Sequence, residues 1–379
     1  MAEYLTNTTD LTKVASAIRE KGGTSDSLVY PGGFVTAIQD IQTGTERQII
    51  VTVKSGATVT ATKGSLSVSG TSVNGTCTLI VPEAGTWSVS ATLGGQTSDT
   101  KTVSITDSYS LTLYFVSSTL NNNEWSVIKS VSDAGQGANY WSIGDRKEVT
   151  LNGTVGHLTL SNYTTYAFII GFNHNASVEG TNRIHFQLAK TALSGGTDVC
   201  FCDNKYAPDS GWSSPGAGYF VMNARSTNSG GWKSSQMRTN ICGTSLSSYS
   251  GTIIAVIPAA LRAVLKSVTK YTNNTGNSSA ASAVTATTDY FFLLSEFEVF
   301  GSISYGNTNE KNKQAQYAYY SAGNSKLKYK HNSTSTAVFW WIRSPTASYA
   351  NRFVNMGTNN QVGYDGASMS FGFTPGFCV

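Results

Sequence analysis

The hydrophobic positions along this chain follow three patterns in succession. In residues 1–44 they recur at helical spacing in two short stretches, separated by the glycine-containing break "KGGTSD", and Asp10 is the expected N-cap of the first stretch. The two predicted apolar stripes consist of Leu11, Val14, Ala15, Ile18, Phe34, Val35, Ile38 and Ile41. Two helices of this length cannot bury a core alone, so we expect residues 1–44 to pack against copies of themselves or against a partner.

Residues 45–107 change to an alternation of apolar and polar side chains, interrupted by turn residues at short intervals. Along "EAGTWSVSA" this alternation places Trp87, Val89 and Ala91 on one face of a strand. The pattern predicts a small antiparallel β-sandwich of the immunoglobulin-like type. The segment has no cluster of histidines or carboxylates, so we expect it to be a spacer.

Residues 108–379 mix helical and strand patterns and are predicted to form one larger domain, which makes the chain an α+β multidomain protein. A strand in 108–118 is expected to connect it to the sandwich. The predicted helices are 121–135, 230–242, 258–272 and one that begins at Ser295, where Glu298 completes a capping box. The predicted strands are 164–174, 183–189, 251–257 and 337–344.

Composition narrows the classes of function. The chain has 379 residues, too many for one ordinary core, and its abundant Gly, Ser, Thr and Asn are typical of short strands joined by turns. Charged residues make up only 13% and the net charge is +4 without runs of like charge, which gives no indication of nucleic-acid binding. The longest apolar runs, such as "LTLYFV", are far too short for membrane insertion, and "MAEYLTNTTD" does not resemble a secretory signal, so we expect synthesis in a cytoplasm.

The residues that carry metal and acid–base chemistry are sparse. The five cysteines are expected to be mostly reduced, and Cys200 and Cys202 are interpreted as alternating strand residues because no Cys/His quartet has zinc spacing. Glu296 and Glu298 lie two residues apart at a helix start, where they serve the cap and the helix dipole better than the two sides of a sugar. The scattered histidines are expected to be structural. We expect no catalytic residue, no metal ligand and no enzyme activity.

Several stretches resemble known families. "DLTKVASAIREKGGTSDSLVYPGGFVTAIQDIQTG" resembles the N-terminal segment of tail proteins from phages and prophages of Gram-positive bacteria, and the sandwich resembles bacterial immunoglobulin-like spacers. In the larger domain, seven segments resemble, in order, a family of uncharacterised function in gut-bacterial and prophage proteins. They are "ANYWSIGD", "FIIGFNHN", "NSGGWKSSQMR", "FFLLSEFEVFG", "QYAYYSAGNS", "WWIRSP" and "SFGFTPGFCV". That family is similar to the C-type lectin fold of formylglycine-generating enzymes, a fold that also forms the receptor-binding head of phage proteins diversified by retroelements.

The resemblance implies binding rather than oxidation. The enzymes of this fold bind copper through a cysteine pair late in the domain, whereas the late part of this domain contains one cysteine, Cys378. Lectins of this fold often bind sugars through calcium, but their Glu-Pro-Asn and Gln-Pro-Asp motifs are absent here. We therefore expect no cofactor and keep calcium as an open alternative.

The stretch that follows Pro345 has the composition of an adaptable binding surface. Tyrosine provides a rigid amphipathic surface, and Asn, Ser and Gly provide flexible hydrogen bonding. The candidate ligand-binding residues are Tyr349, Asn351, Arg352, Asn355, Asn359, Asn360, Gln361, Tyr364 and Asp365. By the resemblance, residues 346–370 would be the segment that a retroelement diversifies. Trp340 and Trp341 alternate along the preceding strand and are expected to be mainly the buried scaffold that displays this segment.

The sequence thus predicts a modular tail fibre or receptor-binding protein. Residues 1–44 attach it to other tail proteins and assemble a homotrimer, residues 45–107 are the spacer, and residues 108–379 recognise a bacterial cell-surface receptor, either glycan or protein. By the resemblance it would reside in the virion tail and be released by host lysis. Two alternatives remain at this point: a surface-glycan depolymerase or glycosidase, and a purely structural tail or baseplate component.

Overall fold

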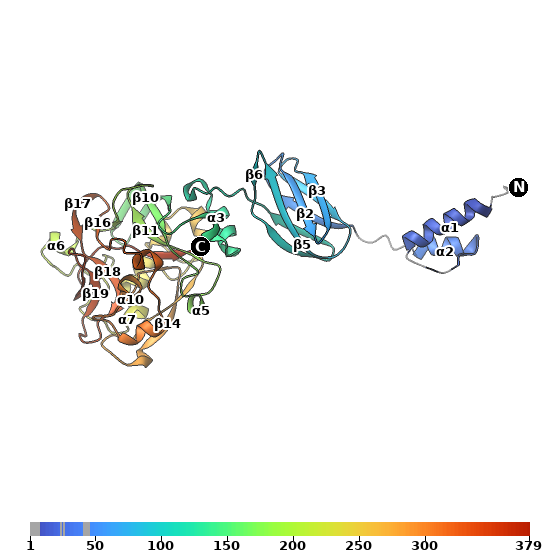
Figure 1. Cartoon of the computed structure of the whole chain (residues 1–379). Helices are drawn as coiled ribbons and strands as arrows, with labels where there is room; N and C mark the ends of the chain where they lie inside the picture. Colours follow the sequence, from blue (N-terminus) through green and yellow to red (C-terminus); the bar gives the residue numbers. More distant parts are fainter. Residues whose placement is uncertain (1–7, 23–24, 26, 41–45) are drawn as a thin grey trace. The chain divides into compact units, whose positions relative to one another are not determined.

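The computed structural model describes residues 8–22, 25, 27–40 and 46–379 (Figure 1). The chain divides into two compact units, Met1–Tyr114 and Phe115–Val379. Helices and strands are interspersed within the second unit, so the protein is of the α+β class. No described helix combines the length and the apolar character that crossing a bilayer requires.

Two helices, α1 (Thr8–Gly22) and α2 (Gly32–Asp40), pack against each other in the first unit (Figure 1). Their small core consists of the buried side chains of Ala15, Ile18 and Phe34. The predicted stripes are only partly buried, because two helices contact each other along one narrow line: Val14, Val35 and Ile38 are exposed. The helix α1 begins before Asp10, which therefore lies in its first turn and is not its N-cap. The predicted position Ile41 lies outside the described residues.

The rest of the first unit consists of two β-sheets. One sheet has the order β4-β1-β8, and the other has the order β3-β2-β5-β6 with β7 also paired to β5. Trp87, Val89 and Ala91 are buried together on β5, as the alternation predicted. The strands are β1 (Arg47–Thr52), β2 (Thr58–Lys63), β3 (Leu66–Thr71), β4 (Thr76–Val81), β5 (Gly85–Leu93), β6 (Gln96–Thr97), β7 (Lys101–Ile105) and β8 (Ser108–Thr112).

The strand β8 was expected to open the larger domain, but it pairs in parallel with β1 in this unit. Its Leu111 is buried, and the Leu113 amide that follows it donates to the carbonyl of Thr52. The division between the two units therefore falls after Tyr114 and not at residue 107.

The second unit is built around a five-stranded sheet with the order β15-β21-β11-β10-β9. The last strand of the chain lies between β15 and β11, so the C-terminus is part of the core. The strands are β9 (Arg146–Val155), β10 (Leu158–Phe172), β11 (Ile184–Lys190), β15 (Phe291–Phe292) and β21 (Gly376–Cys378).

Three smaller sheets complete the second unit. They have the orders β12-β16-β17, β13-β14 and β18-β19-β20. Their strands are β12 (Val199–Cys200), β13 (Val268–Asn273), β14 (Val284–Asp289), β16 (Lys328–Lys330), β17 (Ser333–Val338), β18 (Trp340–Pro345), β19 (Arg352–Met356) and β20 (Val362–Gly366).

The helices of this unit are short. They are η1 (Leu120–Asn122), α3 (Trp125–Asp133), α4 (Gly137–Tyr140), α5 (Ala176–Glu179), α6 (Ala207–Ser210), α7 (Gly231–Ser234), the π-helical turn η2 (Met237–Cys242), α8 (Ile253–Val256), α9 (Ala259–Arg262), η3 (Ala281–Ala283), α10 (Glu296–Phe300), η4 (Thr308–Asn312) and α11 (Ala318–Ser321).

The predictions of secondary structure are confirmed where one element buries one apolar face. The helix α3 and the capping box of α10 lie where the sequence placed them, and so do β10 and β11. The predicted strand 251–257 is wrong, because it contains the helix α8. The predicted helix 258–272 stops after α9, and its second half joins a sheet as β13. The predicted helix 230–242 is split between α7 and η2.

Both adjacent tryptophans are fully buried, in agreement with the predicted scaffold role. As consecutive residues of β18 they lie on opposite faces of the strand, and Trp340 pairs with Met356 and Trp341 with Asn355 on β19. Each indole N–H has a carbonyl acceptor: Trp340 donates to Lys326 at 3.0 Å and Trp341 to Phe220 at 2.9 Å. The pair therefore anchors the sheet that carries the predicted binding residues.

Candidate recognition surface

A cluster of aromatic side chains and one arginine is displayed by the sheet β18-β19-β20 and its neighbouring loops. The Arg352 guanidinium carbon lies 4.6 Å from the ring centre of Tyr349 and 4.9 Å from that of Tyr364. The two rings stack at 5.2 Å, and Tyr305 packs edge-on against Tyr364 at 4.6 Å. We call these four residues the tyrosine cluster. Tyr305 is 36% exposed and Tyr349 is 43% exposed, so the cluster offers aromatic surface and a cation to a ligand.

A buried carboxylate fixes the loop that carries Tyr305. Glu296 is fully buried at the start of α10 and accepts hydrogen bonds from the backbone amides of Ser304, Tyr305 and Gly306. Burial raises the pKa of this carboxyl, and the three amide donors act in the opposite direction. Glu296 therefore positions an exposed aromatic residue.

A buried amide fixes the loop that carries Tyr349. The side-chain nitrogen of Asn228 donates to the carbonyls of Thr346, Tyr349 and Arg352, at 3.2, 2.7 and 3.0 Å. Its backbone amide donates to the carbonyl of Ala350 at 2.8 Å. Asn228 is 1% exposed, so one side chain from a distant loop holds both ends of the segment that displays Tyr349 and Arg352.

The other predicted ligand-binding residues are separated by the fold. Asn355 is fully buried and donates to Asp365 at 2.9 Å, so the prediction that Asn355 faces a ligand is wrong. The physical reason is that β19 is covered on both faces. Asp365 is half-buried, and burial raises the pKa of its carboxyl. Asn351 is exposed beside the cluster, and the exposed Asn359, Asn360 and Gln361 form the turn between β19 and β20.

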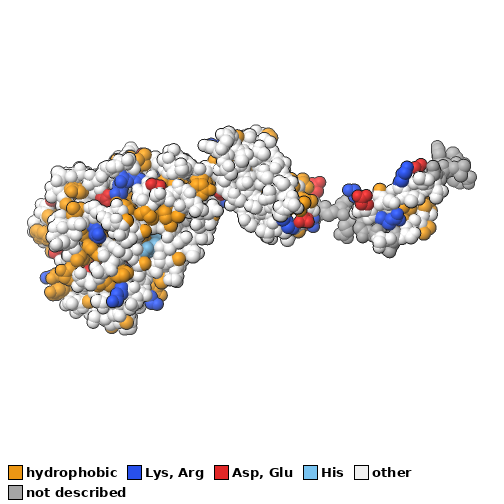
Figure 2. All heavy atoms as spheres, viewed as in Figure 1, with side chains coloured by type: hydrophobic (Ala, Val, Ile, Leu, Met, Phe, Trp, Pro, Cys, Tyr) orange, Lys and Arg blue, Asp and Glu red, His pale blue; other side chains and the backbone are white. Residues whose placement is uncertain are grey.

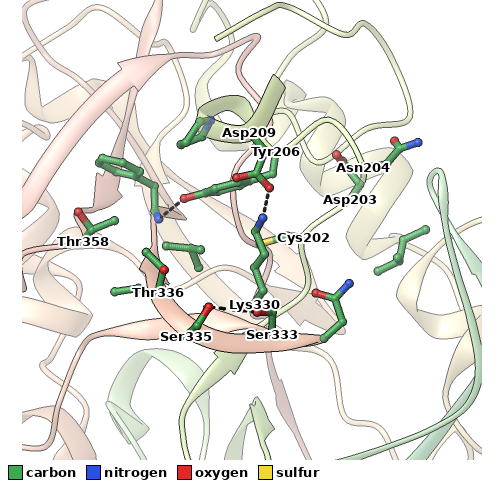
Figure 3. Close-up of a pocket in the computed structure, with 16 residues that line it drawn as sticks. Cys202, Asp203, Asn204, Tyr206, Asp209, Lys330, Ser333, Ser335, Thr336 and Thr358 are labelled. Atoms are coloured by element: carbon green, nitrogen blue, oxygen red, sulfur yellow. Dashed lines mark hydrogen bonds and ion pairs between the residues drawn. The ribbon is translucent and has the colours of Figure 1, made fainter. Parts of the chain in front are cut away.

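A cavity of about 670 Å³ lies near that turn. Its walls come from six residues of the segment 202–209, around α6, and from eight residues of the segment 330–339, along β16 and β17, with Leu158 and Thr358 completing it (Figure 3). The half-buried Leu158 and Phe339 and the buried Val338 supply apolar surface. Exposed hydroxyl and amide side chains line the rest: Asn204, Asn332, Ser333, Ser335, Thr336 and Thr358. We call it the β17 cavity.

One ion pair lies on the wall of the β17 cavity. The Lys330 ammonium contacts the Asp209 carboxylate and lies 4.9 Å from the ring centre of the buried Tyr206 (Figure 3). The Tyr206 hydroxyl accepts the backbone amide of Phe339 at 2.9 Å, and burial raises its pKa. A second wall carboxylate, Asp203, is buried and already accepts the Phe220 amide and the Ser370 hydroxyl. The wall thus offers mainly neutral and mutually neutralised groups to a ligand.

A buried ionic network lies behind the sheet β18-β19-β20. Glu298 accepts two hydrogen bonds from Arg343, at 2.5 and 2.9 Å, and one from Lys270 at 3.0 Å. Lys270 also contacts Glu179 at 2.6 Å and the Tyr317 hydroxyl at 2.8 Å. All of these residues are buried, so the network holds β18 to α10 and β13.

Part of this network has the composition of a metal site. Atoms of His174, Glu179 and Glu298 lie within 4.8 Å of one another. Lys270 and Arg343 already pair with the two carboxylates, however, and calcium prefers six to eight oxygen ligands. The cluster therefore does not fit the calcium ion that was kept as an alternative.

The two buried histidines, His174 and His185, are packed against other buried side chains. Burial is the main cause that lowers the pKa of His174, to about 3, and the pKa of His185. His174 stacks on Tyr317 at 3.7 Å, and His185 Nδ1 lies 3.2 Å from the Tyr317 hydroxyl. Both rings are therefore neutral near pH 7.

Sequence reasoning missed Tyr305, Asn228 and both walls of the β17 cavity. Tyr305 lies more than 40 positions before Tyr349 in the sequence, and Asn228 more than 110 positions before Arg352. The position of Asn228 in a segment that carries the family resemblance was a signal, but only the fold shows which carbonyls it contacts. Figure 2 shows few charged side chains on the visible face of the second unit, in agreement with the low content of charged residues. The distribution of charge therefore does not mark a binding surface on this face.

Comparison with known proteins gives one family match. Residues 219–379 match the model of a family described as a domain of unknown function (DUF6273). This segment contains the tyrosine cluster, Asn228 and the β17 side of the cavity, whereas α6 precedes it. No curated protein matches the chain.

Proposed function

We propose that this chain is a phage or prophage tail protein whose second unit binds a bacterial surface ligand, glycan or protein. In this proposal the second unit has a C-type-lectin-like fold, the two sheets of the first unit are an immunoglobulin-like spacer, and the helices α1 and α2 join the protein to the tail. The tyrosine cluster is the observation that carries the proposal. Exposed aromatic rings held rigidly beside an arginine are typical of binding surfaces, because they offer contact area at a low cost in entropy.

The arrangement of Glu296 and Glu298, the carboxylate pair that the sequence singled out, favours binding over hydrolysis. A glycosidase needs two carboxyl groups that face a sugar, about 5–10 Å apart. Glu296 holds three backbone amides, and Glu298 pairs with Arg343 and Lys270. Both side chains are fully buried, so neither can reach a glycan.

The first unit supports assembly into an oligomer, for which we propose a homotrimer. Val14, Val35 and Ile38 are exposed on α1 and α2, whose core is too small to be stable alone. Linking several heads raises their avidity by effective concentration, so each head can bind weakly. We place the assembled protein in the virion tail, from which lysis of the host releases it.

The test is adsorption of the labelled full chain to cells of Gram-positive gut bacteria, compared with the double variant Tyr349→Ala/Tyr364→Ala. We expect the double variant to lose at least about tenfold in affinity, equivalent to about 1.4 kcal/mol, because it removes two rings and the support of Arg352. Tyr109→Ala is the matched control, since Tyr109 in the first unit is also 43% exposed.

Three results would decide between the alternatives. Equal adsorption of the double variant and the wild type would remove the tyrosine cluster from the function. Failure of the wild type to adsorb to any strain would favour a purely structural tail component. Release of sugars from purified cell-wall glycan would favour the depolymerase.

We also propose that a retroelement diversifies parts of residues 346–370. Phe353, Val354 and Met356 are fully buried, so substitutions there would disturb the fold. The diversified positions would be the exposed ones, such as Tyr349, Asn351 and the turn 359–361. Sequences of sibling phages without clustered substitutions at these positions would contradict this proposal.

A further inference from the structure

We infer that the β17 cavity binds the terminal pyranose residues of a neutral glycan. The inference rests on the proposed function and assigns it a second, deeper subsite, distinct from the tyrosine cluster. A cavity of about 670 Å³ falls within the range of small-molecule binding pockets and can enclose the end of an oligosaccharide.

The charges of the wall select against an ionic ligand. Asp209 and Lys330 neutralise each other, and the oxygens of Asp203 are occupied by donors from the protein. Among the described residues that line the cavity, Lys330 is the one cation and it is paired with Asp209, so an anionic sugar would meet the carboxylates of the lining without an unpaired lining cation to offset them. A neutral hydroxyl can donate to Asp209 and accept from Lys330 at the same time, so the pair suits a polyol.

The remaining surface matches a pyranose ring. The exposed hydroxyls of Ser333, Ser335 and Thr336 can exchange hydrogen bonds with sugar hydroxyls in either direction (Figure 3). The apolar surface of Val338 and Phe339 can cover the C–H face of the ring or the methyl of an acetamido group. Polar and apolar groups therefore lie on different parts of the wall, as they do on a sugar.

The turn between β19 and β20 contributes Thr358 to the cavity wall. Thr358 lines the cavity, and the exposed Asn359, Asn360 and Gln361 follow it directly. These amides lie next to the wall in the chain, and we assign them contacts with the sugar residues that follow the bound end of the glycan. This gives a role to three of the residues that the sequence singled out and that lie outside the tyrosine cluster.

The first experiment fills the cavity. Titration calorimetry of the full chain would use methyl glycosides of glucose, galactose, rhamnose, N-acetylglucosamine and N-acetylgalactosamine. We expect at least one of them to bind, and Thr336→Trp to weaken its binding at least about tenfold. Thr334→Trp is the matched control, because Thr334 is exposed on the same strand but does not line the cavity; its affinity should stay within about twofold of the wild type.

The second experiment reverses the selection by charge. Asp209→Asn removes the partner of Lys330 at a half-exposed position, so we expect the fold to persist. This variant should bind the neutral glycoside more weakly and should gain affinity for methyl glucuronide and glucose 6-phosphate, because the ammonium is freed.

The outcomes separate the cavity from the proposed function. Binding of none of the neutral glycosides, or equal binding by Thr336→Trp and the wild type, would overturn the cavity inference. If the wild type then still adsorbs to cells and the double variant Tyr349→Ala/Tyr364→Ala does not, the proposed function stands. Stronger binding of the charged sugars than of the neutral ones by the wild type would also overturn the inference.

Discussion

At the scale of single residues, buried polar side chains decide where exposed aromatic ones stand. Glu296 holds the backbone at Tyr305, and Asn228 holds the backbone at Tyr349 and Arg352. Neither residue needs to touch a ligand. Each removes the freedom of a loop, so the tyrosine cluster is already ordered before it binds, which lowers the entropy cost of binding.

Asn228→Ala tests this role. The substitution removes the donor to the buried Thr346 carbonyl and one of the donors to the Tyr349 and Arg352 carbonyls, which also accept from Thr346. We expect a loss of about 1–3 kcal/mol in unfolding free energy and weaker adsorption to cells. Urea denaturation and the adsorption assay measure the two effects. Asn240→Ala changes the same residue type at an exposed position and should alter neither. An Asn228→Ala protein with unchanged stability and adsorption would show that the loop orders itself.

At the scale of elements, the helix α10 and the strand β18 depend on one ion pair. The capping box at Ser295 and Glu298 was legible in the sequence. The second role of Glu298 is its ion pair with Arg343, which joins α10 to β18. The two residues are 45 positions apart, so the sequence did not predict this pair. The same network accounts for the strand β13, which the sequence predicted as helix. Lys270 contacts both Glu179 and Glu298, and the pairing of β13 with β14 places Lys270 between them.

Arg343→Met is expected to cost about 3–5 kcal/mol of unfolding free energy, because it leaves a buried carboxylate with one partner fewer. The double variant Arg343→Met/Glu298→Gln removes the stranded charge as well. It should therefore be more stable than the sum of the two single variants predicts, which a double-mutant cycle by urea denaturation would measure. Additive effects would mean that the pair does not join these elements.

At the scale of the whole molecule, the buried ionisable groups set the response to pH. Burial raises the pKa of Glu179 and of Glu310 from 4.5 to about 7. As the pH falls, these carboxyls take up a proton at a higher pH in the folded state than in the unfolded state. They therefore stabilise the fold as the pH falls from 7 to 4.5. Burial lowers the pKa of His174 from 6.5 to about 3 and that of His331 to about 4. Burial also lowers the pKa of His185, an effect that the raised pKa of Glu296 opposes. As the pH falls, the histidine rings take up a proton at a higher pH in the unfolded state than in the folded state. They therefore destabilise the fold below pH 6.5.

We therefore expect the unfolding free energy to change little between pH 7 and 5 and to fall steeply below pH 4.5. The gain from the two carboxyls is complete at 4.5, while the loss from the histidines continues. Glu298 adds to the loss: burial alone would raise its pKa, but Arg343 and Lys270 lower it, so its contribution disappears as the pH falls.

Urea midpoints followed by tryptophan fluorescence would measure this profile in a Trp87→Phe background, since the other six of the seven tryptophans lie in the second unit. Glu310→Gln removes one compensating carboxyl, so its stability should begin to fall already below pH 6.5. A midpoint that rises between pH 4.5 and 3 would contradict this account.

Local patterns determined much of this protein. Alternation fixed the buried face of β5, helical spacing fixed α3, and one short motif fixed the cap of α10, because each depends on neighbours within a few positions. The composition after Pro345 also identified Tyr349, Arg352 and Tyr364, which the fold brings together.

Only the tertiary structure decided which of those residues face solvent and what holds them. It buried Asn355, brought Tyr305 from a distant segment to the exposed cluster, placed the buried Asn228 beneath that cluster, and brought α6 to β17 to form a cavity. The physical reason is that burial and charge pairing are satisfied by residues far apart in the chain. The sequence shows which apolar and charged side chains must be buried or paired, and the packing of the whole unit determines which residues they contact.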